Sequence, residues 1–523
     1  MVSHALIPTV LTPAVGKAVR AAARLHGGGT AFPGKVVEKL DPGFMARTLG
    51  QLPYGVVLVS GTNGKTTTTR IIASVLESLG LRVFTNPTGS NFTRGVVSAL
   101  LDRVGMDGHL DADIAVLELD EAYAVHFVRR VKPRYTLRLN VMRDQLDRFG
   151  EIDNTARLLG KAAAATTGTL VLNREDPRVA ALASVAPRGT AIRYFGLDES
   201  LRRFFPSDDS MHCELASDGG AEAASENGQV GEAAGSAAGA TSVAAAAGAA
   251  SENVAEVDAA TAAADSAADQ LPADVTLMAV DGNSATFRMD DSEYDATLRL
   301  EGVYNLFNAA AAMTVVRAVM DDVNEKKLAA SAAAQRSGRG YGIQGGAIQD
   351  GNIHDDERSA TGRSEDDAAR RLIAAISEVT PAFGRGETIQ VNGTAVELIL
   401  VKNPMGFRLA LTSFPAEGHG TMIVINDQYA DGRDMSWLWD VDFASLRATG
   451  VDMVSGVRAT DMALRLAYDG VEARSIDEDI DRAVKRFLAG NPNQPKHIYC
   501  TYTAMLAVRK RVATFTHVED AGL

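Results

Sequence analysis

Residues 56–80 read VVLVSGTNGKTTTTRIIASVLESLG, and this stretch decides the fold class. An apolar, β-branched run at 56–59 leads into a glycine-rich turn, and a helix-favouring segment follows from Thr67. Glycines let backbone N–H groups face phosphate oxygens, and the N-terminus of the helix adds its positive dipole. In such a loop Lys65 would reach the β- and γ-phosphates, and Thr66 would ligate Mg²⁺. The stretch therefore predicts a phosphate-binding loop between a strand and a helix.

One position of the loop departs from the usual pattern. The pattern G-x-x-x-x-G-K-[ST] carries a glycine at the position where this chain has Val59. An ordinary glycine turn ahead of a helix is the alternative interpretation, but the register of the loop with both the strand and the helix favours phosphate binding. We therefore expect nucleotide contacts from Gly61, Thr62, Asn63, Gly64, Lys65, Thr66 and Thr67.

Short β-rich runs alternate with helical stretches over residues 51–206, which is typical of a parallel sheet covered on both faces. One of these runs, DIAVLELDEA, ends in Glu118, Asp120 and Glu121. Because the ligands of such sheets bind at the carboxyl ends of the strands, this acidic strand end favours a ligand site over a solvated surface. The same alternation over residues 371–523 predicts a separate, smaller C-terminal α/β domain.

Low-complexity segments divide the rest of the chain. The net charge is −14, and the stretch from Asp208 to Asp274 holds 13 acidic residues and no Lys or Arg. Its alanine-rich composition cannot bury enough apolar surface to offset the entropy of ordering, so we expect 207–272 to be a disordered insertion. The other expected parts are an N-terminal extension at 1–50, an ATP-binding domain at 51–330 and a flexible linker or insertion at 331–370.

Composition argues against several classes of protein. The chain has no basic stripe with interleaved aromatics, so we expect no nucleic-acid partner. No apolar run approaches the roughly 20 residues that span a bilayer, and we expect neither a membrane span nor a signal peptide. Cys213 and Cys500 lie far apart with no C-x-x-C, which favours the cytoplasm and gives neither a disulfide framework nor a zinc site. The basic segment 15–26 is either a solvated helix face or a contact for an anionic membrane surface.

These motifs resemble those of the Mur ligase superfamily, which includes folylpolyglutamate synthase. GTNGKTT is similar to the superfamily's loop, in which the first glycine is not required. LNVMRDQLDRFGEID resembles its N-[VI]-x-x-D-H-[LM]-D-R segment at Asn140, Asp144, Asp147 and Arg148. Gln145 stands where the superfamily has a histidine that binds a second metal ion, so the resemblance does not carry a second metal site over to this chain.

The resemblance also implies roles for residues outside the loop. Glu118 matches the glutamate that holds Mg²⁺, together with Thr66. The remaining matches are nucleotide contacts at Asn173 and Asp176 in LVLNREDPRV, adenine contacts at Asn305 and Asn308 in EGVYNLFNAAAA, and Arg385 in PAFGRGETI, at the start of the C-terminal domain. The resemblance thus implies a Mur-ligase-type ATPase domain with a parallel-rich sheet, followed by a smaller α/β domain.

The C-terminal stretches resemble one branch of the superfamily. NDQYADGRDMSWLWDVDF, SGVRATDMALRLAYDG and YCTYTAML are similar to the MurT family, the Mur-ligase-like subunits of lipid II isoglutaminyl synthases, as is RLHGGGTAFPGKV near the N-terminus. Members of this family commonly carry a four-cysteine zinc ribbon in the ATPase domain. Here that place holds only Cys213, which cannot make a tetrahedral zinc site, so we expect no zinc.

The MurT resemblance implies an ATP-dependent amidation. ATP would phosphorylate the α-carboxylate of D-glutamate in the lipid II stem peptide, and ammonia would attack the acyl phosphate to give D-isoglutamine. Since neither cysteine has a credible glutaminase arrangement, the resemblance implies a GatD-type glutamine amidotransferase subunit as partner in a heterodimer. An aspartate of this chain would complete the partner's triad. We predict Asp434 for it, with Asp440 and Asp431 as alternatives, although each could instead cap a turn.

Several alternatives remain open at this point. Trp437 and Trp439 are expected to alternate on one side of an extended segment, either in the core or as an anchor for the partner. A stand-alone amino-acid ligase of the Mur or folylpolyglutamate type is the second hypothesis, and a nucleotide-binding scaffold without activity is the third. With Lys65, Glu118 and Asp434 as catalytic residues, we expect a cytoplasmic enzyme that meets its lipid-linked substrate at the inner membrane face.

Overall fold

The computed structural model describes most of the two predicted α/β regions. The acidic stretch expected to be disordered lies outside the described residues up to residue 270, as do Cys213 and the predicted Asp144, Gln145, Asp147 and Arg148. The described residues are 9–25, 32–86, 92–142, 152–204, 271–300, 302–337, 366–380 and 385–518.

A nine-stranded sheet forms the core of the larger region. Neighbouring strands run parallel from β2 to β7, and β8 and β9 extend the sheet as an antiparallel hairpin. β1 lies between β3 and β4, so the chain reverses its direction across the sheet beside β1, where such folds bind ligands. In sheet order the strands are β2 (Val83–Thr85), β3 (Ile114–Glu118), β1 (Val56–Ser60), β4 (Tyr135–Arg138), β5 (Thr169–Asn173), β6 (Ala191–Leu197), β7 (Val275–Asp281), β8 (Ser284–Met289) and β9 (Ser292–Thr297).

Helices cover both faces of this sheet, which explains why every residue of β1 and β3 is buried. α4 and α12 share one apolar core with Val57 and Val59, and α5 and α6 share another with Val56 and Leu58. The helices of this region are α4 (Lys65–Ser78), α5 (Thr93–Arg103), α6 (Glu121–Val128), α8 (Ile152–Ala163), α9 (Pro177–Ala180), η2 (Ala181–Val185), η3 (Glu199–Phe204) and α12 (Val303–Ser337).

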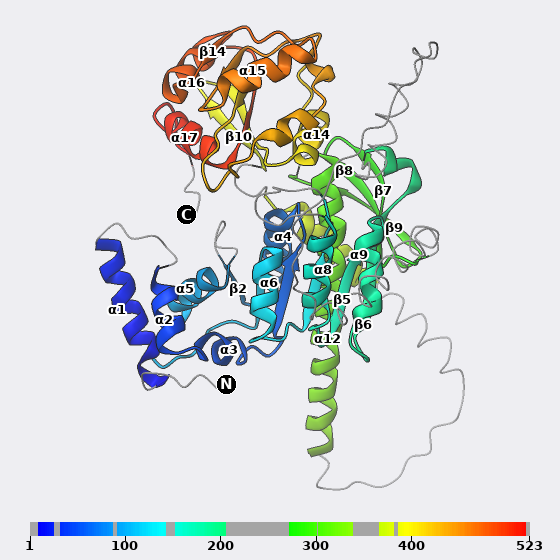
Figure 1. Cartoon of the computed structure of the whole chain (residues 1–523). Helices are drawn as coiled ribbons and strands as arrows, with labels where there is room; N and C mark the ends of the chain where they lie inside the picture. Colours follow the sequence, from blue (N-terminus) through cyan, green and yellow to red (C-terminus); the bar gives the residue numbers. More distant parts are fainter. Residues whose placement is uncertain are drawn as a thin grey trace, which may run out of the picture.

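α12 is the longest helix in the described part of the chain. By length and composition its segment Val303–Ser331 could cross a membrane, but 72% of its apolar window is buried inside the protein. It packs on α4 and on β4 to β7, and Figure 1 shows only its C-terminal end projecting beyond the sheet. α12 is therefore a core helix. Polar Asn308, Thr314 and Arg317 interrupt its apolar residues, so the helix meets the length of a membrane span without an unbroken apolar run.

The N-terminal helices pack on the outer side of α5. The core beneath them joins Val37, Phe44 and Met45 to Val96 and Leu100. These elements are η1 (Thr9–Leu11), α1 (Thr12–Leu25), α2 (Phe32–Leu40) and α3 (Phe44–Leu49).

A six-stranded sheet forms the C-terminal region, which lies over the N-terminus of α4 in Figure 1. β10 and β11 pair antiparallel and the other neighbours pair parallel. In sheet order the strands are β10 (Arg385–Val391), β11 (Thr394–Leu400), β15 (Lys496–Cys500), β12 (Gly420–Val424), β13 (Met453–Ser455) and β14 (Ile476–Asp477). The helices are α14 (Pro404–Ser413), η5 (Ser436–Asp440), η6 (Ala444–Leu446), α15 (Ala459–Tyr468), α16 (Ile480–Ala489) and α17 (Tyr502–Val512).

The predicted fold class is confirmed: a parallel-rich α/β domain is followed by a smaller α/β domain. The segment expected as a linker at 331–370 is shorter than its predicted bounds. α12 continues to Ser337, and residues 366–377 are again helical, with Leu372 and Ile376 buried in the core of the larger sheet. Good helix formers such as alanine at 329–334 allow the helix to continue past the predicted boundary.

Candidate functional site

The predicted phosphate loop joins β1 to α4 at the carboxyl edge of the large sheet. Gly61 and Gly64 adopt φ values of 143° and 85°, which L side chains rarely adopt. A Cβ at Gly64 would also lie 2.5 Å from Oδ1 of Asn308. Gly64 is thus required twice, by its backbone conformation and by the close approach of α12.

Lys65 lies folded into this loop, only 6% exposed. Its Nζ donates to the carbonyl of Gly61 at 2.7 Å and lies 3.4 Å from that of Thr62. The same amine lies 3.3 Å from Oδ1 of Asp120 and 3.5 Å from Oε1 of Glu121. Asp120 and Glu121, which follow β3, therefore balance the positive charge of Lys65, a task that a bound phosphate would otherwise perform.

Thr66 and Glu118 come together as predicted for a cation site. Thr66 Oγ1 donates to Glu118 Oε1 at 3.1 Å. The Asn86 amide fixes the Glu118 backbone from both sides, since its Oδ1 accepts from the Glu118 N–H at 3.0 Å and its Nδ2 donates to the carbonyl at 3.1 Å. The described residues hold no group of three or more His, Cys, Asp or Glu able to bind a metal. Thr66 and Glu118 fit Mg²⁺, which commonly takes one or two carboxylates and completes its shell with water and phosphate.

Arg138, at the end of β4, adds a cation beneath the acidic strand end. Its side chain is fully buried, and its nitrogens have no hydrogen-bond acceptor among the described residues. Burial lowers the pKa of Arg138 to about 9, and the Glu121 carboxylate acts in the opposite direction. Sequence reasoning missed this residue, because an arginine inside an apolar run is typical of a surface position.

Asn140 holds the loop from the neighbouring strand. Its Oδ1 accepts from the Asn63 N–H at 2.8 Å, and its Nδ2 donates to the Asn63 carbonyl at 3.1 Å and to the Tyr304 hydroxyl at 3.2 Å. The Thr62 N–H also donates to the Asn140 carbonyl at 3.0 Å. Asn140 therefore fixes the loop and ties it to the start of α12.

The C-terminal domain contacts the loop directly through the turn between β11 and α14. Lys402 Nζ donates to the Thr62 carbonyl at 3.0 Å, and Asn403 Nδ2 donates to Asn63 Oδ1 at 3.0 Å. The Asn403 side chain also caps α14, since its Oδ1 accepts from the Gly406 N–H at 2.7 Å. The phosphate loop thus lies at the junction of the two domains.

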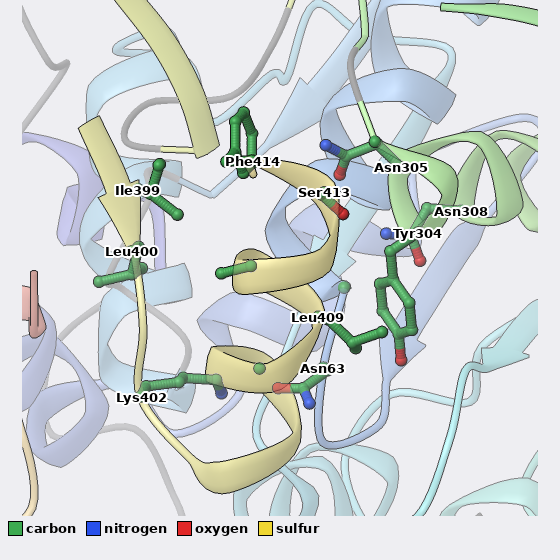
Figure 2. A pocket seen from close by; sticks show the side chains of 14 residues that line it. Asn63, Tyr304, Asn305, Asn308, Ile399, Leu400, Lys402, Leu409, Ser413 and Phe414 are labelled. Carbon is green, nitrogen blue, oxygen red and sulfur yellow. The ribbon is translucent and has the colours of Figure 1, made fainter. Parts of the chain in front are cut away.

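A pocket of about 110 Å³ opens beside this junction (Figure 2). The two asparagines predicted to contact adenine, Asn305 and Asn308, line it from α12, and Leu409 and Phe414 line it from α14 and the residue after it. The other lining residues are Asn63, Gly64, Gly302, Tyr304, Ile399, Leu400, Lys402, Gly406, Ala410 and Ser413. Apolar walls with a few amides suit a planar, hydrogen-bonding base.

Asn173 and Asp176 lie beyond the lining of this pocket and bond to the backbone. Asn173 Nδ2 donates to the Leu139 carbonyl at 2.8 Å. Asp176 accepts from the backbone N–H groups of Val141 at 2.7 Å and Val179 at 3.1 Å. Burial raises the pKa of Asp176 to about 6, although these hydrogen bonds act in the opposite direction. Both residues here position the ends of β4 and β5, and their contact with nucleotide stays a prediction.

Arg385, also predicted to contact nucleotide, is the first residue of β10, at a register shift opposite Ile399 and Leu398. Its neighbour Glu387 forms an ion pair with Arg509. These contacts place the predicted G-R-x-E motif at the edge of the C-terminal sheet.

The three candidate aspartates differ in their surroundings. Asp434 is exposed and accepts from the Ser436 N–H at 2.9 Å; hydrogen bonds from Ser436 hold its pKa below the usual value. Asp440 is exposed too. Asp431 is buried and accepts from the backbone N–H groups of Thr503 at 2.7 Å and Gln428 at 3.0 Å. Asp431 therefore fixes the start of α17, whereas the exposed Asp434 keeps a carboxylate at the surface.

The two tryptophans do not lie on one side of an extended segment, and this expectation is wrong. They belong to the short 3₁₀ helix η5, in which residues two apart diverge. Trp437 is buried and packs edge-on against Phe407 at 6.5 Å between ring centroids. Trp439 is 49% exposed and contacts Tyr468 edge-on at 5.1 Å. One ring thus belongs to the core and the other to the surface.

Cys500 is not a nucleophile in this structure. It is fully buried at the end of β15, and burial raises the pKa of its thiol well above the ordinary value. A catalytic cysteine needs an accessible thiolate.

Sequence reasoning missed Lys402, Asn403 and Asn86. The sequence K-N-P after the strand 394–400 was a signal for the first two, because an asparagine before a proline at a strand end is a typical helix N-cap. Their contact with a loop 340 residues earlier could not be read from spacing.

Comparisons with protein families match both domains. The model of the Mur ligase middle domain matches residues 59–220, and that of the MurT ligase C-terminal region matches residues 400–505. Among solved structures, MurF from Acinetobacter baumannii aligns with a TM-score of 0.55 at 15% identity, covering 90% of this chain and 78% of that one. MurF from Thermotoga maritima in complex with ADP gives 0.54 at 15% identity, covering 92% and 83%. These likenesses show the Mur ligase fold.

Two curated relatives align with nine-tenths or more of the chain. The MurT subunit of the glutamine-hydrolysing lipid II isoglutaminyl synthase of Streptococcus pneumoniae is 27% identical over 497 residues, which is 93% of each chain. Its Staphylococcus aureus counterpart is 27% identical over 480 residues, covering 90% of this chain and 91% of that one. The UDP-N-acetylmuramoylalanine–D-glutamate ligase of Paraburkholderia phymatum is 33% identical, but over only 158 residues, or 30% of each chain.

Proposed function

Because the chain belongs to the MurT family of Mur-ligase-like proteins, we propose that it is the ligase subunit of a lipid II isoglutaminyl synthase. One observation carries this proposal: the similarity to two MurT subunits runs through both domains, with nine-tenths or more of each chain aligned. The match to the D-glutamate ligase covers only 30% of the chain, whereas the MurT ligase C-terminal model matches residues 400–505. The C-terminal domain therefore favours amidation over the addition of an amino acid.

The proposed reaction has two steps. An oxygen of the D-glutamate α-carboxylate in the lipid II stem peptide attacks the γ-phosphorus of ATP, and the bond from that phosphorus to the β-phosphate oxygen breaks, releasing ADP. Ammonia then attacks the acyl carbon, phosphate leaves, and a proton lost from nitrogen leaves the neutral amide of D-isoglutamine. Phosphorylation is needed because a free carboxylate oxygen is a poor leaving group.

The loop fits the first step. In the structure Lys65 forms ion pairs with Asp120 and Glu121. When ATP binds, its ammonium group would pair with the β- and γ-phosphates instead. Thr66 and Glu118 would hold Mg²⁺, which neutralises charge on the phosphates. The pocket lined by Asn305 and the residues of α14 would take the adenine.

Ammonia would come from a separate glutaminase subunit, of the GatD type. The curated name "subunit" of the relatives supports a partner. Cys500, buried and with a raised thiol pKa, cannot hydrolyse glutamine itself. Asp434 would complete the partner's triad, because its exposed, ionised carboxylate could accept a hydrogen bond from an incoming histidine. A lipid-linked acceptor would bring the complex to the inner face of the membrane.

The test is mass spectrometry of lipid II incubated with the purified chain, Mg-ATP and ammonium, and in parallel with the partner and glutamine. We expect a carboxyl-to-amide mass change that requires ATP in both cases and requires the partner only when glutamine is the nitrogen donor. Unchanged lipid II in every arm would overturn the proposal. Addition of a free amino acid by the chain alone would instead establish the stand-alone ligase, which the 33% identity to a D-glutamate ligase over 158 residues favours.

A further inference from the structure

Positive side chains from three helical segments of the larger region gather around one carboxylate. Glu38 of α2 pairs with Arg94 of α5, with 3.3 Å between Nε and Oε2. It also pairs with Arg130, which follows α6, with 2.5 Å between Nη1 and Oε1. Figure 1 shows α2 and α5 side by side, and the two helices pack on each other. The carboxylate thus joins segments that lie up to 92 residues apart in the sequence.

Cations outnumber acidic side chains on this surface. Lys35 and Lys39 of α2 are exposed, as are Arg129 and Lys132 at the end of α6. In the described part of the chain, no carboxylate lies within ion-pair distance of these four side chains, although the whole chain has a net charge of −14. Together with the two arginines bound to Glu38 they form a basic face, which consists of Lys35, Lys39, Arg94, Arg129, Arg130 and Lys132.

Exposed aromatic rings accompany the basic face. Phe32 is 52% exposed and lies about one turn before Lys35 and two turns before Lys39, on the same side of α2. Tyr123 of α6 is 39% exposed and contacts Phe92, with 6.0 Å between the ring centroids. Amphipathic surfaces that lie on anionic bilayers combine lysines and arginines with such rings, which sit at the level of the headgroups. The basic face and its two exposed rings therefore match the chemistry of a lipid surface.

The basic face also lies close to the ATP site. α6 begins at Glu121, whose Oε1 lies 3.5 Å from Nζ of Lys65, and it ends at Val128, directly before Arg129. This helix has eight residues, and at about 1.5 Å per residue it is about 12 Å long. A substrate whose lipid tail stays in the bilayer could therefore present its peptide to the phosphate loop while the basic face contacts the headgroups.

α1 is less suited to this contact than α2. The sequence left open whether the basic segment 15–26 is a solvated face or touches an anionic membrane. In the structure Arg20 of α1 forms an ion pair with Asp102 of α5, which balances its charge. Lys35 and Lys39 have no such carboxylate among the described residues. The lysines of α2 are therefore the ones that headgroup phosphates would balance.

We infer that the basic face, with Phe32 and Tyr123, is a docking surface for the anionic phospholipids of a membrane. This inference rests on the proposed function for its lipid-linked acceptor and names the surface that brings the chain to that acceptor. Headgroup phosphates balance the lysines and arginines, and the ring of Phe32 enters the interfacial layer. Because Asp434 belongs to the C-terminal domain, lipid and the glutaminase partner bind different domains.

The experiment measures cosedimentation of the full chain with phosphatidylcholine vesicles and with vesicles that contain about one-third phosphatidylglycerol. We expect binding to the anionic vesicles to be about 10-fold or more tighter and to weaken as salt is added. The double variant Lys35→Gln, Lys39→Gln should bind them about 10-fold or more weakly, since each lost charge costs about 5-fold, and Phe32→Ser about 5-fold more weakly. Lys485→Gln, Lys510→Gln is the matched control, because it removes two exposed lysines from the C-terminal domain.

Amidation with ammonium as nitrogen donor gives a second readout. With lipid II embedded in the anionic vesicles, we expect the apparent KM of the Lys35→Gln, Lys39→Gln variant to rise about 10-fold, with kcat unchanged. With a water-soluble analogue of lipid II that carries a short chain, we expect the variant and the normal chain to be equal, because this substrate requires no bilayer. Lys35→Arg, Lys39→Arg keeps both charges and should behave as the normal chain does with either substrate.

The outcomes separate this inference from the function on which it rests. Equal binding of the normal chain to neutral and anionic vesicles, or equal losses in the Lys35→Gln, Lys39→Gln variant and its control, would overturn the docking surface. Weaker binding of that variant to the glutaminase partner, with vesicle binding unchanged, would also overturn it and assign the basic face to a protein. Failure of the normal chain to amidate the short-chain analogue would overturn the proposed function itself. Thermal unfolding checks that each variant is folded.

Discussion

Asn63 in the phosphate loop and Asn403 at the N-cap of α14 exchange hydrogen bonds between their side-chain amides. Asn403 Nδ2 donates to Asn63 Oδ1 at 3.0 Å, and Asn63 Nδ2 lies 3.4 Å from Asn403 Oδ1. Both side chains are buried in the structure, and their mutual hydrogen bonds form only while the domains are docked. The pair therefore links the stability of the C-terminal helix to the docking of the two domains.

Asn403 has two separable roles, and two substitutions should divide them. Asn403→Asp keeps an oxygen for the Gly406 N–H but cannot donate to Asn63. Asn403→Ala loses both contacts, and we expect it to lower the free energy of unfolding by about 1 kcal/mol more than the aspartate variant. Urea unfolding followed by circular dichroism measures the difference. Equal losses in the two variants would show that the cap contributes nothing.

Asp176 should make stability depend on pH. Its pKa is raised to about 6 by burial, above the ordinary value of 3.8, so the folded chain binds the proton more tightly than the unfolded one. The stability that this group contributes is full below pH 3.8 and is lost as the pH rises through 6. Relative to Asp176→Asn, which does not titrate, the unfolding free energy should therefore fall by about 1 kcal/mol between pH 5 and pH 7. A constant difference across this range would contradict the raised pKa.

The site divides into a part that the sequence predicts and a part that it cannot. Lys65, Thr66 and Gly64 lie within one strand–turn–helix segment, where local spacing sets the geometry, and Glu118 follows because parallel strands end at the same edge. Lys402 reaches the loop only through the docking of a second domain. That contact depends on packing between domains, which no local pattern records.

The two tryptophans show that a prediction from sequence spacing can also fail within one short segment. Two aromatics two residues apart read as one face of a strand, but the segment after Asp434 folds as a 3₁₀ turn. Capping by Asp434 of the Ser436 N–H favours this turn over an extended chain. The sequence contained that signal, and the aromatic spacing outweighed it in the prediction.

Cys500 should be dispensable for chemistry. Its thiol is fully buried, so Cys500→Ala should cost about 1 kcal/mol of stability through lost packing and leave the glutamine-driven rate of the complex unchanged. Alkylation of the folded chain, read by peptide mass spectrometry, should also spare Cys500. A glutamine-driven rate that falls in Cys500→Ala, with the ammonium-driven rate intact, would place the glutaminase cysteine in this chain.

Asp434 should matter only when glutamine is the nitrogen source. Asp434→Asn keeps an oxygen for the Ser436 N–H and removes the charge, so we expect the glutamine-driven amidation rate to fall about 100-fold or more, with ammonium-driven amidation kept. Asp431→Asn is the comparison. It disturbs the buried contact with the Thr503 N–H and should destabilise the domain by about 1–3 kcal/mol, lowering both rates at higher temperature. If both rates fall together in Asp434→Asn at low temperature, the aspartate belongs to the ligase site or the fold.

Trp439 and Trp437 offer a matched pair for the partner surface. Trp439 and Tyr468 form an exposed aromatic pair on the same domain as Asp434, and tryptophan is enriched among residues that dominate binding. We expect Trp439→Ala to weaken the complex with the glutaminase by about 10-fold or more and to leave unfolding of the free chain nearly unchanged.

Trp437→Ala should do the reverse, because that ring is buried against Phe407. It should cost about 3–5 kcal/mol of unfolding free energy. Trp437→Phe should cost much less, since the indole Nε1 of Trp437 has no acceptor among the described residues and its loss leaves no partner unsatisfied. Calorimetric titration of the partner into each chain, alongside thermal unfolding, separates the two effects. Unchanged affinity in Trp439→Ala would place the partner on another face, and Asp434 would then have to act from a different side of the domain.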